Sequence, residues 1–163
     1  MTTKKIATLG VLTALYVVLS AFLKFSLFGN IMIDLGYITF AVALCTFGIY
    51  GTIVGVIGCA LESILFSAYG FSISWVCANL TIGIICGLTF PRFHKNIWKY
   101  IIACVAVAIA MIGVKTIIEC NLYNIPLAVK IPKNLVAFYA DSITMVLGIG
   151  LYDTLKHRVN LRA

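Results

Sequence analysis

The middle of the chain, residues 35–91, reads LGYITFAVALCTFGIYGTIVGVIGCALESILFSAYGFSISWVCANLTIGIICGLTFP and holds one formal charge, at Glu62. At a helical rise of about 1.5 Å per residue, these 57 residues would extend about 85 Å, nearly three hydrocarbon thicknesses of a bilayer. A stretch this long and apolar must fold back on itself twice within a membrane. Glycines favour turns near Gly48–Gly51 and near Gly70.

The whole chain continues this pattern on both sides of the central stretch. Its 163 residues are 63% hydrophobic and 10% charged, whereas a soluble domain has roughly 25% charged residues. The mean hydropathy is +1.11. Because one span needs about 20 apolar residues, the sequence predicts an all-α polytopic membrane protein, a six-transmembrane-helix bundle in a single transmembrane domain over 1–163. The predicted spans are roughly 6–23, 35–49, 52–69, 72–90, 100–119 and 134–153.

Basic residues predict the orientation, since loops rich in Lys and Arg stay in the cytoplasm. They gather on one side of a six-span arrangement: near the N-terminus, in the loop Arg92–Lys99 and in the C-terminal tail. Both termini are therefore predicted to be cytoplasmic. These topology signals account for the net charge of +7, so no nucleic-acid partner is predicted. The outer loop 120–133 is an exception to the rule, because it carries Lys130 and Lys133.

Polar side chains inside the predicted spans share one depth. Such residues are costly in a membrane unless they are paired or hydrated, so they are candidate functional residues. Helical rise places five of them, from four spans, in the outer third of the membrane. They are Glu62, Asn79, Lys115, Glu119 and Asp141. Unrelated polar residues would scatter in depth, so this layer predicts a ligand cavity that opens to the outside.

Aromatic and amide side chains near the same layer would complete a binding site. Trp75, Phe138 and Tyr139 would stack on a ring of the ligand. Asn79 and Asn134 would form hydrogen bonds with it. An alternative for the aromatic residues is the membrane interface, where Trp and Tyr are enriched.

The charged residues of the layer allow two interpretations. In the first they set the charge preference of a ligand, and three acids against one lysine favour a neutral, zwitterionic or cationic molecule over a polyanion. In the second they only hold the bundle together: Lys115 pairs with Glu119 or Asp141, and Glu62 hydrogen-bonds Asn79.

The first predicted span has a different character, since it carries no buried charge. Ala7, Gly10 and Ala14 form a face of small residues along it. Such a face lets another helix approach closely. That helix belongs either to this protein or to a partner.

Three stretches of the chain resemble the S component, the substrate-binding subunit, of energy-coupling factor (ECF) vitamin transporters. Residues 5–19, KIATLGVLTALYVVL, resemble the opening helix of that family, with Gly10 in place of the first alanine of its A-x-x-x-A motif. Residues 47–62 resemble the glycine-spaced third helix, although Glu62 stands where the family usually has aspartate. Residues 83–87, GIICG, match the small-residue face of the fourth helix.

The resemblance implies a function and a set of partners. S components are six-helix proteins with both termini inside and a vitamin site that faces outward, built from helices four to six and outer loops. They assemble in the prokaryotic cell membrane with a transmembrane coupling subunit and two cytoplasmic ATPase subunits. The opening helix packs on the coupling subunit, which makes Ala7, Gly10 and Ala14 expected interface residues. Since this chain has no G-x-x-x-x-G-K-[ST] motif, ATP-driven transport would depend on such partners.

Two other functions are alternatives: a structural or assembly subunit, which needs only the small-residue face, and an intramembrane enzyme. An enzyme requires a nucleophile with a base, or a metal constellation. Both histidines, His94 and His157, lie on the predicted cytoplasmic side, away from the acidic layer. The sequence has no H-E-x-x-H, G-x-S-x-G or C-x-x-C motif. No cofactor, metal site or catalytic residue is therefore predicted.

Overall fold

The computed structural model describes residues 2–22, 25–28, 31–66, 70–93 and 96–159 of the chain. Most of these residues are helical, which confirms the predicted helical architecture. Four helical stretches are long and apolar enough to cross a membrane: Thr3–Phe22, Gly36–Phe66, Asn96–Tyr123 and Leu127–Lys156. A further apolar helix, Ile73–Thr89, is shorter than these.

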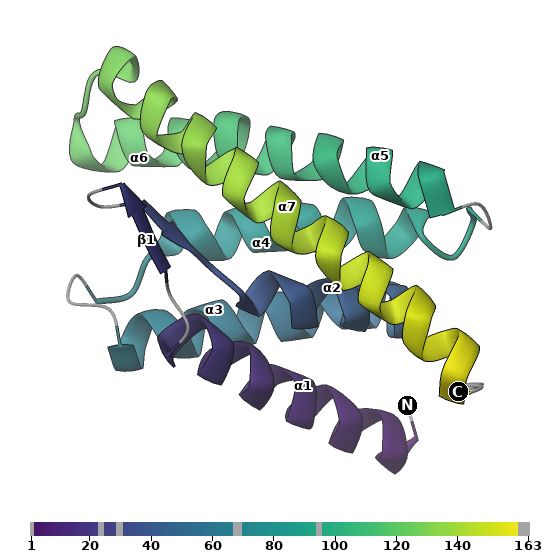
Figure 1. The fold of residues 1–163 in the computed structure, drawn as a ribbon. Helices are drawn as coiled ribbons and strands as arrows, with labels where there is room; N and C mark the ends of the chain where they lie inside the picture. The colour runs from purple at the N-terminus through teal and green to yellow at the C-terminus, as the bar shows by residue number, and fades with distance from the viewer. Residues whose placement is uncertain (1, 23–24, 29–30, 67–69, 94–95, 160–163) are drawn as a thin grey trace.

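The first half of the chain contains α1 (Thr3–Phe22), β1 (Phe25–Phe28), β2 (Ile31–Ile33), α2 (Gly36–Phe47), the 3-10 turn η1 (Gly48–Gly51) and α3 (Thr52–Phe66). The second half contains α4 (Ile73–Thr89), α5 (Asn96–Ala108), the π-helical segment η2 (Ile109–Lys115), α6 (Thr116–Tyr123) and α7 (Leu127–Val159). The ends of two predicted spans, 23 and 67–69, lie outside the described residues. Because α5, η2 and α6 follow one another without a break, they form one rod (Figure 1).

The connection between α1 and α2 contains two short strands that the sequence did not predict. β1 and β2 pair antiparallel, with Phe25 opposite Ile33. Runs of four and three residues are too short for an alternating pattern to stand out. Directly after β2, Oδ1 of Asp34 accepts hydrogen bonds from Ser20 Oγ (2.6 Å) and from the Gly36 N–H (2.8 Å). The exit of the hairpin is thereby tied to the end of α1 and the start of α2.

Glycines lie where the helices of the central stretch approach most closely. At Gly51 a Cβ atom would come within 2.6 Å of the Ala43 carbonyl carbon, because η1 turns the chain back on α2. At Gly87, on α4, it would come within 2.7 Å of the Ile49 Cα. Small residues thus permit backbone-to-backbone packing at this turn.

The start of α7 differs from the sequence prediction. The span predicted at 134–153 belongs to a longer helix that begins at Leu127 and has Pro132 inside it. Pro126 precedes the first helical residue, where a proline favours a helix start. Placing Pro126 in the loop before the last span was therefore correct, whereas extending that loop through Pro132 to 133 was wrong. The consequence is that Lys130 lies on a helix and has a defined position against α6.

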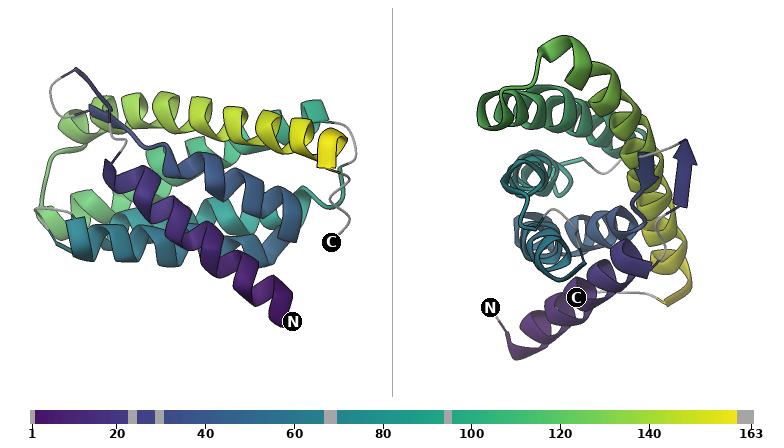
Figure 2. Two further views of the ribbon diagram at one scale, coloured as in Figure 1. Left: turned by 60° about the horizontal axis from the view of Figure 1, so that its bottom comes forward. Right: turned by 90° about the vertical axis from the view of Figure 1, so that its left-hand side faces the viewer.

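The helices lie side by side and alternate in direction (Figures 1 and 2). The start of α1, the turn η1 and the end of α7 lie at one end of the bundle, which we call the η1 end. The β-hairpin and the junction between α6 and α7 lie at the opposite end, the hairpin end. Helix α1 lies along the margin of the bundle. Only 17% of its 18 most apolar consecutive residues are buried, compared with 50% for the corresponding residues of Gly36–Phe66.

Candidate functional site

A cluster of buried polar side chains lies in the half of the bundle toward the hairpin end. It is formed by α4, η2, α6 and α7, which contact one another there. Each member is less than one-tenth exposed: Ser74, Asn79, Lys115, Thr116, Glu119, Asn134 and Asp141. We call these seven residues the polar cluster. Five of them belong to the site predicted from the sequence.

Lys115 contacts the face of an aromatic ring. Its Nζ atom lies 3.4 Å from the centroid of the Trp75 ring, which itself packs against the hydrophobic core. A desolvated cation on an indole face is stabilised by about 2 kcal/mol. Within the described part of the chain, Lys115 forms no direct ion pair with a carboxylate, although the Glu119 and Asp141 side chains lie near enough for their charges to act on it. The predicted alternative of a direct pair between Lys115 and Glu119 is therefore wrong.

Glu119 instead joins three helices. Its Oε2 atom lies 2.9 Å from Nζ of Lys130, on α7, and accepts a 3.4 Å hydrogen bond from Nδ2 of Asn134. Its Oε1 atom accepts a 3.2 Å hydrogen bond from Ser74 Oγ, on α4. The carboxylate is thus fully engaged by the protein. The sequence analysis did not include Lys130 among the residues around Glu119. The signal that could have found it is its position in a predicted outer loop, where basic residues are unusual.

Asn134 forms a hydrogen bond with Thr116, on the rod formed by α5, η2 and α6. Its Nδ2 donates a 2.9 Å hydrogen bond to Thr116 Oγ1. Thr116 Oγ1 in turn donates a 3.1 Å hydrogen bond to the carbonyl oxygen of Met111, five residues earlier. This chain of hydrogen bonds links α7 to the π-helical segment η2.

Asn79 and Asp141 carry polar atoms that have no partner. Both atoms of the Asn79 amide and Oδ2 of Asp141 are buried without a hydrogen bond to any described residue. Leaving such a group unpaired costs about 1–3 kcal/mol, and native proteins pair nearly all of them. The proposed bond between Glu62 and Asn79, which the sequence left open, is not formed.

The remaining predicted site residues lie at or beyond the margin of the cluster. Glu62 is buried on α3. Phe138 is partly buried against the core. Its ring lies 5.1 Å from that of Tyr139, centroid to centroid, and Tyr139 is 58% exposed on the outer surface of the bundle. The structure thus does not bring Tyr139 into the polar cluster, because its position on α7 faces outward.

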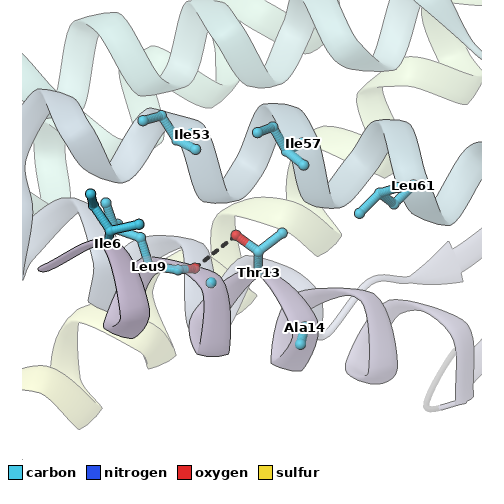
Figure 3. A pocket seen from close by; sticks show the side chains of 8 residues that line it. Ile6, Leu9, Thr13, Ala14, Ile53, Ile57 and Leu61 are labelled. Atoms are coloured by element: carbon cyan, nitrogen blue, oxygen red, sulfur yellow. Dashed lines mark hydrogen bonds between the residues drawn. The ribbon is translucent and has the colours of Figure 1, made fainter. Parts of the chain in front are cut away.

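A groove of about 430 Å³ runs between α1 and α3 (Figure 3). Its lining residues are Ile6, Leu9, Gly10, Thr13, Ala14, Ile53, Ile57 and Leu61. The Thr13 hydroxyl donates to the Leu9 carbonyl at 2.8 Å, so the walls are essentially apolar. A Cβ atom at Gly10 would meet nothing within 4 Å. The small-residue face of α1, to which Ala7 and Ala14 also contribute exposed side chains, is therefore left open by this chain.

The described residues contain no group of three or more His, Cys, Asp and Glu side chains that could hold a metal ion. His94 lies outside the described residues, and the side chain of His157 is not described.

Two solved structures share this fold. A crystal structure of the S-component for biotin from an ECF-type ABC transporter is 21% identical, covers 96% of this chain and 95% of its own, and superposes with a TM-score of 0.71. A crystal structure of FolT bound with folic acid is 22% identical, covers 91% of this chain and 94% of its own, and has a TM-score of 0.72. At these identities the similarity establishes the fold alone.

A comparison with curated protein sequences gave no match. A family model described as "ECF-type riboflavin transporter, S component" matches residues 1–156, nearly the whole chain. This match agrees with the resemblance seen in the sequence and with the helical fold. The chain therefore belongs to the family of ECF-type riboflavin transporter S components, and it is a membrane protein.

Proposed function

We propose that this chain is the membrane-embedded substrate-binding subunit of an ATP-driven ECF-type importer, and that it captures a vitamin from outside the cell. The observation that carries the proposal is the pair of buried, unpartnered groups, Asn79 and Asp141, in one polar cluster with the cation–π pair of Lys115 and Trp75. Membership of the S-component family supports the same function.

The charges of the polar cluster favour a neutral or zwitterionic ligand. Lys130 balances Glu119, which leaves Lys115 and Asp141, one base and one acid, as the remaining ionisable members of the cluster. Riboflavin, named in the description of the family, is uncharged at neutral pH and combines a planar ring system with hydrogen-bonding edges. We therefore take riboflavin as the first ligand to test.

The free groups suggest how such a ligand would be held. Its ring would stack on Trp75, and its polar edge would satisfy the Asn79 amide. Lys115 covers one face of the Trp75 ring without ligand, so the ammonium would stay in place, and it would form a charge-assisted hydrogen bond with the polar edge of a ligand stacked beside it. Glu119 and Asn134 would support these residues from behind, while ligand contacts by Glu62, Phe138 or Tyr139 remain predictions.

We propose that six helical segments cross the bilayer, with both termini in the cytoplasm. They are α1, α2, α3, α4, the rod formed by α5, η2 and α6, and α7. The start of α1, the end of α7 and the connection from α4 to α5 lie at the η1 end, where the basic residues of the sequence also gather. The polar cluster would then open toward the outer surface. Fusion of a reporter to each terminus and to the 67–69 connection tests this topology.

The open face of α1 is proposed as the docking site for the transmembrane coupling subunit, which would recruit two cytoplasmic ATPase subunits. Gly10 and Ala14 line the apolar groove, and a Cβ atom at Gly10 would meet nothing within 4 Å. A close contact with a partner helix would explain why position 10 is a glycine, which otherwise only lowers helix stability. The other apolar faces would contact lipid.

The test is an equilibrium titration of the purified chain, in detergent or nanodiscs, with riboflavin and with a panel of other vitamins. The proposal expects saturable binding of one vitamin to the chain alone. It also expects Lys115→Met to weaken that binding about tenfold or more, since a hydrogen bond between the ligand and a charged group contributes about 1.5–3 kcal/mol. Absence of saturable binding across the panel would contradict it.

Three further variants distinguish a binding subunit from an assembly subunit, and a turnover assay distinguishes it from an intramembrane enzyme. An assembly subunit would keep its function in Asn79→Ala and Asp141→Ala, and lose it in Gly10→Leu. A binding subunit would fail in both sets, the first through lost ligand binding and the second through lost coupling. An intramembrane enzyme would convert a substrate without any partner.

A further inference from the structure

The rod formed by α5, η2 and α6 changes its helical phase just before Lys115. Ala106 and Ala110 are four residues apart on its buried face, and the next buried positions after Ala110 and its neighbour Met111 are Lys115 and Thr116, five residues further on in each case. In a regular α-helix, five residues turn the chain by about 500°, which would place Lys115 about 140° around the axis from Ala110. The π-helical segment Ile109–Lys115 absorbs the additional residue and restores the phase. Lys115 faces Trp75 for this reason.

Specific hydrogen bonds hold the π-helical segment at its end. The Thr116 N–H donates to the Gly113 carbonyl, and the Thr116 hydroxyl donates to the Met111 carbonyl at 3.1 Å. Asn134, from α7, donates to the same hydroxyl at 2.9 Å. Asn134 and Thr116 are 1% and 2% exposed, so water does not compete for these bonds. Gly113 weakens the local preference for a regular α-helix, and its α-carbon faces open space.

We propose that Thr116 and Asn134 are positioning residues: together they hold η2 in its π-helical form and thereby place the Lys115 ammonium on the Trp75 ring. Without the Thr116 hydroxyl, the segment relaxes to an α-helix and Lys115 turns about 100° away from the site. The effect on ligand binding rests on the function proposed above. The effect on Trp75 does not, because it occurs in the ligand-free protein.

The experiment uses tryptophan emission of the full chain in nanodiscs. The chain has two tryptophans, and Trp98 lies at the start of α5, 48% exposed. Trp98→Phe therefore serves as the parent in which Trp75 is the single emitter. In this parent, Lys115→Met defines the spectrum of Trp75 without the ammonium. The test variants are Thr116→Val, which removes the hydroxyl at constant shape, and Asn134→Ala, which removes its donor on α7.

Thr116→Val and Asn134→Ala are expected to shift the Trp75 emission toward the Lys115→Met spectrum, whereas Thr116→Ser, which keeps the hydroxyl, retains the parent spectrum. Parent emission in either folded test variant would overturn the proposal. So would a Lys115→Met spectrum identical to that of the parent, or a Thr116→Ser spectrum like that of Lys115→Met.

Riboflavin titration of the same proteins separates the two claims. Thr116→Val should weaken binding about tenfold, because the Lys115 ammonium is turned away from the ligand, and Thr116→Ser should restore it. If no vitamin binds to any variant while the emission follows the expected order, the positioning role holds and the proposed function fails. If riboflavin binds but the emission does not respond to Thr116→Val, the positioning role fails and the function holds.

Discussion

Single buried residues show a conflict between stability and binding. The Asn79 amide is fully buried and has no hydrogen-bond partner among the described residues. A group in this state destabilises the ligand-free protein by about 1–3 kcal/mol. Residues that serve a binding site commonly carry such a cost. Asn79 is therefore the position at which the two demands can be measured separately.

Asn79→Leu should raise the thermal stability of the ligand-free protein and weaken vitamin binding. The substitution removes the unpaired amide while keeping a side chain of similar size, so the expected gain in stability is about 1–3 kcal/mol. Thermal unfolding in detergent, with and without riboflavin, measures both effects. Ile82→Ala, a buried apolar control on the same helix, should lower stability without this gain. A destabilised Asn79→Leu protein would show that the amide has a structural role instead.

At the same scale, the sequence indicated which residue types would be buried but not which would pair. Spacing brought Lys115 and Glu119 to one helical face, and a direct ion pair was a natural alternative. In the structure Lys115 contacts the Trp75 ring and Glu119 pairs with Lys130. The reason is that η2 changes the helical phase of the rod and α7 begins seven residues earlier than the predicted 134. Such pairing depends on contacts between elements, which local patterns do not contain.

Among the helices, glycines have two different uses. At Gly58, on α3, a Cβ atom would come within 2.6 Å of the Tyr16 ring, so this glycine is required for packing against α1. At Gly10, on α1, a Cβ atom would meet nothing within 4 Å. The sequence shows both as parts of small-residue faces. Only the arrangement of helices distinguishes a glycine that packs internally from one that is left for a partner.

This difference predicts opposite effects for two matched substitutions. Gly58→Leu should destabilise the isolated protein by several kcal/mol through overpacking, so it should lower both the unfolding temperature and vitamin binding. Gly10→Leu should leave unfolding and binding near those of the parent, yet abolish uptake in cells that contain the coupling and ATPase subunits. Gly10→Ala is the mild control. Normal uptake by a well-expressed Gly10→Leu protein would show that α1 does not dock the partner.

The ion pair between Lys130 and Glu119 connects α6 to the first turns of α7. Lys130→Ala would leave the Glu119 carboxylate, 9% exposed, without its cation. Hydrogen bonds to charged groups contribute about 1.5–3 kcal/mol, so we expect a loss of about 2 kcal/mol in unfolding free energy. Lys133→Ala, at an exposed position on the same helix, is the matched control and should have little effect. Equal stability of the two variants would argue against the structural role of the pair.

Helix boundaries were predictable to different degrees. The central stretch is so apolar that its glycines marked the turn at η1 correctly. The start of α7 was predicted too late because Pro132 was taken as a loop residue like Pro126, although it is accommodated near the beginning of the helix. The strands β1 and β2 are too short to produce a periodic signal.

For the whole molecule, composition alone predicted a helical membrane protein, and motif spacing along three stretches indicated the S-component family. The family match over 1–156 confirms that assignment. The family and the fold do not identify the ligand, since the fold is shared with an S-component for biotin, 21% identical, and with FolT bound with folic acid, 22% identical. Specificity is set by a few side chains, and neither composition nor fold determines them.

The most direct test of a vitamin site is to identify what the protein carries when it is purified from cells grown in a rich medium. The chain is purified without its partners and denatured, and the released small molecules are analysed by mass spectrometry beside the double variant Asn79→Leu/Lys115→Met. The account predicts one vitamin, with riboflavin as the first expectation, in near-equimolar amount from the parent and a much smaller amount from the variant. Release of no vitamin from the parent, or of equal amounts from both proteins, would contradict it.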